Sequence, residues 1–524
     1  MRFRLFAFRV WTSIFLLALP GFGAGTISGA INNSSGATLN GVFVSAQRNG
    51  APFSTTVYSN DAGRYRFPEL TAGTYTVTAH AGGFQPVRRA NVTVRDGAAL
   101  PMDFTLEAET RPEELIQQAR ASEWLSSLPG TDEQKMSLGK NCGSCHHNLY
   151  HLQGVRFTKE DWVKVISAME RIDVIGEIRE PRPAYYMPWR HGTKDQIAEF
   201  LAKVQGPDSP LPSIKFFPRA SGKATQAVIT EYRVPRVNSV PHDVQLDSQG
   251  NAWYNDFKTD YLGKINPATG EIKEYKLPSK PGFHPGSSNM FVGDDDTIWV
   301  NQRIAGTLTR FDPKTEMVIG RWEKVGWFDR FDSKAGIAYG TQGQLDVTTG
   351  KVRRYEYKAD TDGYGTDVDS RGFAYRGGIA DSDIKLLNPE TGEVVNLLTP
   401  TPDSGPRRIE LDGDDYLWFG EWFGGKIGRV DIKSRKITEY APSVPFAAFY
   451  QAGRDPKNHL GWAYDWRSDR LIRVNPATGE VTEYPMPTRD VESRRTAVDT
   501  STNPPAVWIH GAGNGLIIRV QAPL

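Results

Sequence analysis

Hydrophobic and polar residues follow two different periods along this chain. In residues 25–107 and again in residues 224–524 they alternate in short runs between turn sequences, which predicts β-strands. In residues 112–206 the apolar positions recur every three or four residues, which predicts α-helices. The pattern therefore predicts a multidomain, mainly β protein with a small α-helical domain between two β regions.

The first β region, residues 25–107, has the pattern of a small antiparallel sandwich. Strands are expected at 27–31, 39–44, 64–67 and 74–79. The string NDAGRYRFPELTAGTYTVTAHAGGF resembles the carboxypeptidase regulatory-like domain. That resemblance implies an Ig-like or transthyretin-like β-sandwich with a structural or docking role. Binding of carbohydrate is the alternative role.

The helical region, residues 112–206, predicts four helices. They are expected over 113–125, 135–140, 158–172 and 193–204. Thr193 is the expected N-cap of the last helix, with Gln196 at the capping-box position. A proline-rich loop that contains Met187 separates the last two helices.

Internal repeats dominate residues 224–524. A short string that ends in an aromatic or large apolar residue recurs roughly every 40 to 45 residues, with four short strands expected in each repeat, the sequence pattern of a β-propeller. The repeats predict seven blades, in which a strand near residue 229 joins the tail 488–521 and closes the ring. The strings begin at Ile229, Ile272, Ile319, Val352, Val394, Ile437 and Val481. The recurring tryptophans are expected to pack between blades: Trp253, Trp299, Trp418, Trp462 and Trp508.

The N-terminal residues 1–24 have the features of a cleaved signal peptide. Arginines precede a short apolar stretch at 10–19, and small or turn-forming residues follow it. An uncleaved membrane anchor is the alternative, although the stretch is shorter than the roughly 20 residues that span a bilayer. We expect a periplasmic or secreted protein with no transmembrane segment in the mature chain.

Charge adds one exclusion. The chain carries 62 basic and 61 acidic residues, and no long basic run occurs. A balanced charge argues against nucleic acid as the main partner.

The most specific motif is Cys142-Gly143-Ser144-Cys145-His146, which uses both cysteines of the chain. The C-x-x-C-H spacing is that of a c-type haem attachment site, in which two thiols bind the haem vinyl groups and the histidine ligates iron. A redox dithiol and half of a zinc site are the alternatives. The motif predicts one covalent haem at Cys142 and Cys145, with His146 as an axial ligand.

The order of motif, helix, loop with Met-Pro, and final helix resembles class I cytochrome c. The resemblance implies that His146 is the proximal ligand and Met187 the distal thioether. Met169 on the preceding helix is the alternative distal ligand, and ligation by a second histidine is a further one. The histidines available for it are His147, His151 and His191. Methionine ligation gives a higher reduction potential than bis-histidine ligation.

The propeller repeats resemble the streptogramin lyase (virginiamycin B lyase) family, most closely in LDGDDYLWFGEWFGGKIGRVDIKSRKITEY at 411–440. The resemblance implies a C–O lyase with a histidine base and Mg²⁺ held by glutamates. His242 follows Pro241 as that family's catalytic histidines do, and Glu421 occupies a family loop position. The family's second histidine and the glutamate expected at Val240 are not present, so the lyase is an alternative with His242 and Glu421 as weak catalytic candidates.

The blade loops are also expected to project side chains that suit a polar organic ligand. They are His242, Asp256, Arg407, Glu421, Trp422, Asp465, Trp466 and His510. The favoured hypothesis is an exported electron-transfer protein whose propeller recognises a redox partner protein. The alternatives are a dehydrogenase that passes electrons from a propeller-bound small molecule to haem, the lyase, and a protein that binds a small molecule or a glycan.

Overall fold

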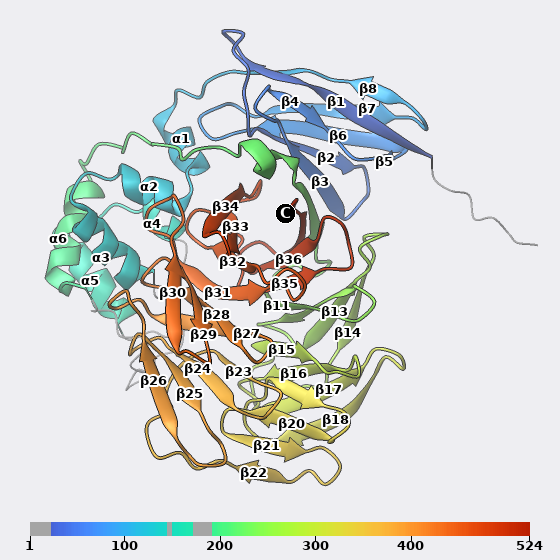
Figure 1. Ribbon diagram of the computed structural model, residues 1–524. Coiled ribbons are helices and arrows are strands. Elements are labelled where there is room, and N and C mark those ends of the chain that lie inside the picture. The colour runs from blue at the N-terminus through green and yellow to red at the C-terminus, as the bar shows by residue number, and fades with distance from the viewer. Residues whose placement is uncertain (1–22, 144–148, 171–190) are drawn as a thin grey trace, which may run out of the picture.

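The computed structural model describes residues 23–143, 149–170 and 191–524. The protein is multidomain and mainly β, with an Ig-like N-terminal domain, a group of helices and a β-propeller-like C-terminal region (Figure 1). In Figure 1 the blue N-terminal sandwich and the cyan helices both lie beside the red C-terminal strands. Within the described residues, no helix has the length and apolar character needed to cross a membrane.

The N-terminal domain is a β-sandwich around one apolar core. The expected strands form, except that the strand predicted at 39–44 begins at Phe43, because Gly41 adopts φ +63° in a turn against Ala220. One sheet is built on β1 (Ala24–Asn33), which pairs with β4 (Arg64–Arg66), β5 (Leu70–Thr71), β8 (Ala99–Pro101) and β9 (Phe104–Leu106). The other sheet contains β2 (Phe43–Arg48), β3 (Phe53–Tyr58), β6 (Gly73–His80) and β7 (Val87–Val94).

The described part of residues 228–521 forms seven four-stranded antiparallel units, called blades here. Blade 1 contains β11 (Pro241–Leu246), β12 (Ala252–Asp256), β13 (Tyr261–Ile265) and β14 (Ile272–Lys276). Blade 2 contains β15 (Asn289–Val292), β16 (Ile298–Gln302), β17 (Thr307–Asp312) and β18 (Met317–Glu323). Blade 3 contains β19 (Arg330–Asp332), β20 (Ile337–Gly340), β21 (Gly343–Asp346) and β22 (Val352–Arg354). Blade 4 contains β23 (Thr366–Val368), β24 (Ala374–Gly378), β25 (Asp383–Leu387) and β26 (Val394–Leu398). Blade 5 contains β27 (Pro406–Asp412), β28 (Tyr416–Glu421), β29 (Ile427–Asp431) and β30 (Lys436–Tyr440). Blade 6 contains β31 (Phe449–Arg454), β32 (Gly461–Asp465), β33 (Arg470–Asn475) and β34 (Glu480–Pro485).

Blade 7 closes the ring and joins it to the sandwich. The tail supplies β35 (Thr496–Asp499), β36 (Ala506–Gly511) and β37 (Leu516–Gln521), and β10 (Val228–Arg233) pairs with β37 as the fourth strand. The closure predicted near residue 229 is therefore confirmed. The other edge of β10 pairs with β3, so sandwich and propeller share one eight-stranded sheet.

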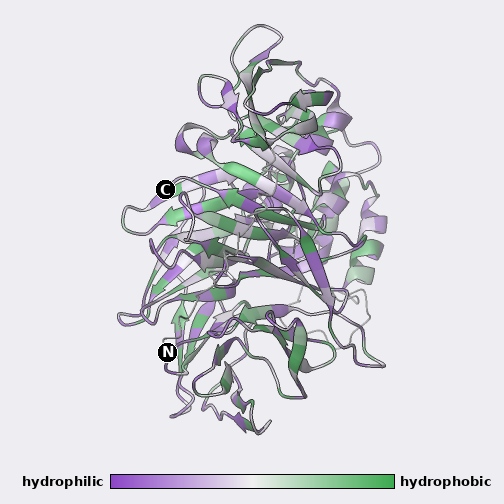
Figure 2. Ribbon diagram, turned by 90° about the vertical axis from the view of Figure 1, so that its right-hand side faces the viewer, coloured by the Kyte–Doolittle hydropathy of each residue, from purple (hydrophilic) through white to green (hydrophobic). Residues whose placement is uncertain are grey.

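The blade tryptophans pack as predicted. Trp253, Trp299, Trp418, Trp462 and Trp508 lie on the second strands of their blades and are all fully buried. The ring of Trp253 in blade 1 lies 5.9 Å from that of Phe311 in blade 2, a contact between neighbouring blades. Hydrophobic and hydrophilic segments alternate along the strands in Figure 2, as expected for packed sheets with polar edges.

The helices differ in two places from the sequence pattern: one expected helix is divided, and a short helix at Tyr150–Gln153 has no counterpart among the four expected. The helix expected over 113–125 is two short helices, because Ala119 and Arg120 are extended and Arg120 forms an ion pair with Asp469 of blade 6. The helices are α1 (Pro112–Gln118), α2 (Ala121–Ser127), α3 (Asp132–Cys142), α4 (Tyr150–Gln153), α5 (Lys159–Met169) and α6 (Lys194–Val204). Thr193 caps α6 and Gln196 completes the capping box, as predicted.

Candidate functional site

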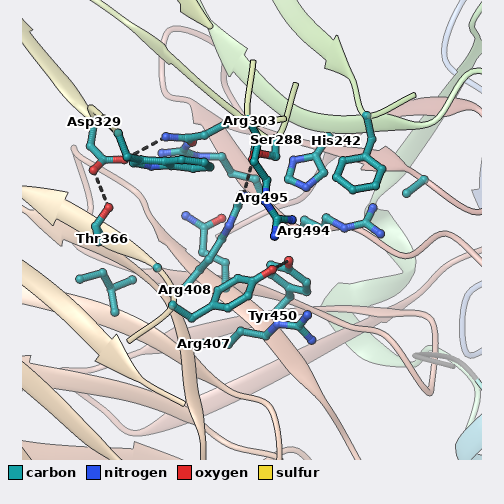
Figure 3. Close-up of a pocket in the computed structure, with 18 of the residues that line it drawn as sticks. His242, Ser288, Arg303, Asp329, Thr366, Arg407, Arg408, Tyr450, Arg494 and Arg495 are labelled. Atoms are coloured by element: carbon teal, nitrogen blue, oxygen red, sulfur yellow. Dashed lines mark hydrogen bonds between the residues drawn. The ribbon is translucent and has the colours of Figure 1, made fainter. Parts of the chain in front are cut away.

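A cavity of about 630 Å³ lies where the blades meet (Figure 3). The first strand of every blade begins at this cavity, and each contributes a lining side chain from its start or from the residues just before it. In blade order these are His242, Asn289, Asp329, Thr366, Arg407, Tyr450 and Arg495. A parallel backbone pairing of Arg408 with Gln451 links the first strands of blades 5 and 6 beside the cavity. The ring of repeats thus gathers one end of each blade into a single site.

The cavity is strongly basic. Among its described lining residues, two are acidic, Asp329 and Glu492. Burial raises the pKa of both carboxyls, and that of Asp329 to about 6. The basic lining residues, apart from histidines, are Lys258, Arg303, Arg376, Arg407, Arg408, Arg494 and Arg495.

Aromatic rings hold two of these guanidinium groups. Arg407 is almost fully buried, with its Cζ 3.9 Å from the ring centroid of Tyr450 and 4.3 Å from that of Trp422. Arg494 lies 5.1 Å from the Trp466 ring. Cation–π contacts of this kind stabilise a buried positive charge and fix its position.

Tyr364 lies in the same cluster. Its hydroxyl is hydrogen-bonded to that of Tyr450, and Arg407 lies 4.9 Å from its ring. Burial opposes its ionisation, but the charges of Arg407 and Arg408 outweigh burial and lower its pKa to about 8. The Tyr364 phenol therefore ionises more readily than an ordinary tyrosine, because two guanidinium groups lie beside it.

Asp243 lies behind the cavity wall and connects three lining residues. Its carboxylate accepts from His242 Nδ1 at 3.0 Å, Arg408 Nη1 at 2.7 Å and Arg495 Nη1 at 3.4 Å. Although burial opposes its charge, these neighbours hold the pKa of Asp243 well below its usual value. Two guanidinium groups thus share one carboxylate. Its single negative charge cannot neutralise both, which leaves excess positive charge at the cavity.

The structure does not bring the two weak catalytic candidates together. His242 lines the cavity, but burial lowers the pKa of its imidazole to about 3, so it is a weak base at neutral pH. Glu421 is fully buried at the end of β28, outside the set of described cavity-lining residues, and burial with nearby Glu439 raises its pKa to about 9. In the parts of the chain with described coordinates, no three His, Cys, Asp or Glu side chains converge as metal ligands.

Three residues expected to project from the loops are instead buried structural groups. Asp256 pairs with Arg236 at 2.9 Å, and Asp465 accepts from the Ala448 amide at 2.9 Å. His510 accepts a hydrogen bond from the Arg494 amide at 3.0 Å and so positions that arginine. The prediction that these three face a ligand was wrong, because they lie at the ends of buried second strands, where backbone and side-chain polar groups need internal hydrogen-bond partners.

The sequence interpretation singled out Arg407 but missed most of the cavity arginines. The signal was present: Arg407-Arg408 and Arg494-Arg495 are doublets at equivalent places, beside the start of a blade's first strand. Adjacent strand residues point in opposite directions, so one doublet serves two sides of the strand. Arg407 contacts the Tyr450 cluster, whereas Arg408 reaches Asp243 in blade 1.

The described part of the haem motif lies at the end of α3. Cys142 is half-buried and packs against the apolar cluster of the helical region, which includes Leu138, Trp162 and Leu201. Cys145, His146, His147 and Met187 lie outside the described residues. Met169 is the last residue of α5 and is 41% exposed. His191 contacts Asp403 of the propeller-like region.

Both described segments beside the motif contact blade 6. Arg467 donates from Nη2 to the Gly139 carbonyl in α3 at 2.8 Å. Tyr150 in α4 donates to Asp469 at 2.8 Å, and the next residue, His151, lines the central cavity. The chain on either side of the C-x-x-C-H sequence is thus held against blade 6, and on the C-terminal side His151 reaches the cavity.

The fold and cavity define a β-propeller-like protein with an Ig-like accessory domain. Residues 26–107 match the carboxypeptidase regulatory-like domain family, close to the predicted 25–107. No match was found among curated proteins. Among solved structures, a streptogramin B lyase is 18% identical with a TM-score of 0.49, over 56% of this chain and 98% of that one. The virginiamycin B lyase of Staphylococcus aureus is 20% identical with a TM-score of 0.46, over 56% and 99%.

Proposed function

We propose that the chain is an exported c-type cytochrome that carries one covalent haem and transfers single electrons. Cys142 and Cys145 would bind the haem, His146 would be the proximal ligand, and Met187 the distal ligand, with Met169 as the alternative. The C-x-x-C-H sequence carries this proposal, because both cysteines of the chain occur in it at the required spacing. Residues 112–206 would form the class I-like cytochrome domain beside a seven-bladed propeller.

The described surroundings of Cys142 fit a haem. Its side chain packs against a cluster of buried apolar residues, which would shield one side of a bound macrocycle from water. Gly143 follows Cys142 in the motif. A Cβ on Gly143 would come within 2.7 Å of Arg467 Nη2, so the motif residue that lies against the propeller is one without a side chain. A bound haem would supply a one-electron iron couple.

Export and a redox partner complete the proposal. Residues 1–24 would direct the chain to the periplasm or the exterior, where c-type haem is attached, and would then be removed. The propeller would recognise a redox partner protein or a small ligand, with nucleic acid excluded as the main partner by the balanced charge.

The test is the mass of the chain purified from a host that matures c-type cytochromes. We expect one covalently bound haem per chain under denaturing conditions, and its loss in Cys142→Ala and Cys145→Ala. Ser144→Ala keeps both thiols and serves as the matched control, which should retain haem. An unmodified mass for the wild-type chain would overturn the proposal.

A second candidate is a dehydrogenase that removes two electrons from a cavity-bound small molecule and passes them to haem one at a time. This candidate needs a second redox cofactor to hold the other electron. The contacts of α3 and α4 with blade 6, and His151 in the cavity lining, favour it. Anaerobic addition of a substrate should reduce the haem, with no partner protein present. Mg²⁺-dependent lyase activity has weaker support, because His242 is a poor base and Glu421 lies elsewhere.

A further inference from the structure

We infer that the central cavity binds a small organic anion that carries at least two acidic groups. The inference goes beyond the proposed electron transfer, because it concerns binding to the propeller and does not require haem. It rests on the charge of the cavity, on the way its guanidinium groups are held, and on its size.

Charge is the first argument. Among the described lining residues, seven lysine and arginine side chains face two carboxyls, and Asp243 behind the wall offsets part of the charge of Arg408 and Arg495. Collecting so many like charges in one recess is unfavourable unless an anion neutralises them. More than one acidic group is needed to match the excess.

The arginines are positioned in advance for such a ligand. Arg408 is fixed by Asp243 and by the Ser288 carbonyl at 2.9 Å, and Arg495 by Asn289 at 3.2 Å and the Met290 carbonyl at 3.0 Å. Arg494 is held through its backbone by His510. Figure 3 shows these three side chains and Arg407 close together. Arg407 and Arg408 come from blade 5, and Arg494 and Arg495 directly precede the first strand of blade 7. Held forks of N–H donors match the paired oxygens of carboxylates and phosphates.

Size and shape favour an organic ligand over an inorganic ion or a sugar. A volume of about 630 Å³ is in the range of cavities that enclose metabolite-sized ligands. Neutral sugars usually stack on an open aromatic face. Here the Tyr450 ring has Arg407, Arg408 and Arg494 guanidiniums within 3.9, 5.4 and 5.9 Å of its centroid. The Tyr450 face thus serves the cations and leaves little room for a sugar ring, whereas Trp327 in the same lining is 37% exposed.

The experiment is calorimetric titration of the full-length mature protein in a buffer without carboxylate or phosphate. The probes are citrate, isophthalate, fructose 1,6-bisphosphate and neutral glucose, at low and at moderate salt. We expect at least one of the three anions to bind and glucose not to bind, with affinity that falls as salt rises. Binding of citrate or isophthalate alone would identify a carboxylate ligand, and binding of the bisphosphate alone a phosphate ligand.

Variants separate the cavity from the rest of the surface. Arg494→Gln should weaken binding about tenfold or more, since it removes one charged hydrogen-bond donor group. Arg407→Gln should do the same, with circular dichroism confirming that this buried site still folds. Arg353→Gln, on the exposed outer strand β22, is the matched loss of charge and should leave binding unchanged.

Three outcomes would overturn the inference: no binding of any anion, equal binding of glucose, or equal weakening by Arg353→Gln. Haem content, measured on the same samples, keeps this test separate from the cytochrome proposal. A chain without haem that still binds an anion would refute only the latter.

Discussion

Ile229→Ala tests the shared sheet between sandwich and propeller. Ile229 is the second residue of β10, the strand that pairs with both β37 and β3, and it is fully buried. Ile319 begins the equivalent string in blade 2, where it lies on the outermost strand of its sheet, β18, and is 50% exposed. The two isoleucines thus differ mainly in whether a further strand covers them.

The expected magnitudes follow from burial. Truncation of a fully buried isoleucine removes apolar contacts and leaves a cavity, which costs about 2–5 kcal/mol. The same change at half-exposed Ile319 should cost below about 1 kcal/mol. Urea unfolding followed by tryptophan fluorescence measures both, and hydrogen exchange of residues 228–233 locates the effect in a multidomain chain. Equal losses for the two variants, or unchanged exchange in β10, would refute the shared-sheet reasoning.

Three further predictions concern other sites. Because the folded-state pKa of Glu421 is raised to about 9, wild-type stability should fall as pH rises from about 4.5 to about 9. Glu421→Gln lacks this titration, so its thermal stability relative to wild type should increase over that range; a constant difference would contradict the raised pKa. Gly143→Ala should destabilise the end of α3 and its contact with blade 6 by about 1–3 kcal/mol in thermal melts, because its Cβ would collide with the Gly139 carbonyl oxygen and lie 2.7 Å from Arg467 Nη2. Gly154→Ala, with open space around it, should be neutral, and equal effects would argue against this contact. Met187→Ala should lower the haem reduction potential more than Met169→Ala in redox titration, and the reverse order would make Met169 the ligand.

The repeats predicted the propeller-like region well because blade packing is local and periodic. Each repeat carries its own outer string, and five of the seven also carry a buried tryptophan on the second strand, so strand order and ring closure follow from the sequence alone. The pairing of β10 with β3 has no such signal, since any strand edge of the right length and twist offers the same backbone groups.

The candidate site was harder to predict than the fold. Arginine doublets at 407–408 and 494–495 are unremarkable in a chain with 62 basic residues. Only closure of the propeller ring places them beside Tyr450, and the residues next to Tyr450 in the sequence give no sign of the cluster. His242 and Glu421 show the converse: both matched a sequence pattern, but burial leaves one a weak base and the other outside the cavity lining.

Reversible oxidation and reduction of the purified chain tests the central claim, electron transfer by a covalent haem, most directly. A redox titration monitored by visible absorption should show a single one-electron transition with the bands of a c-type haem, and Cys142→Ala should abolish them. Absence of haem absorption in wild-type protein from a host that matures c-type cytochromes would contradict the account.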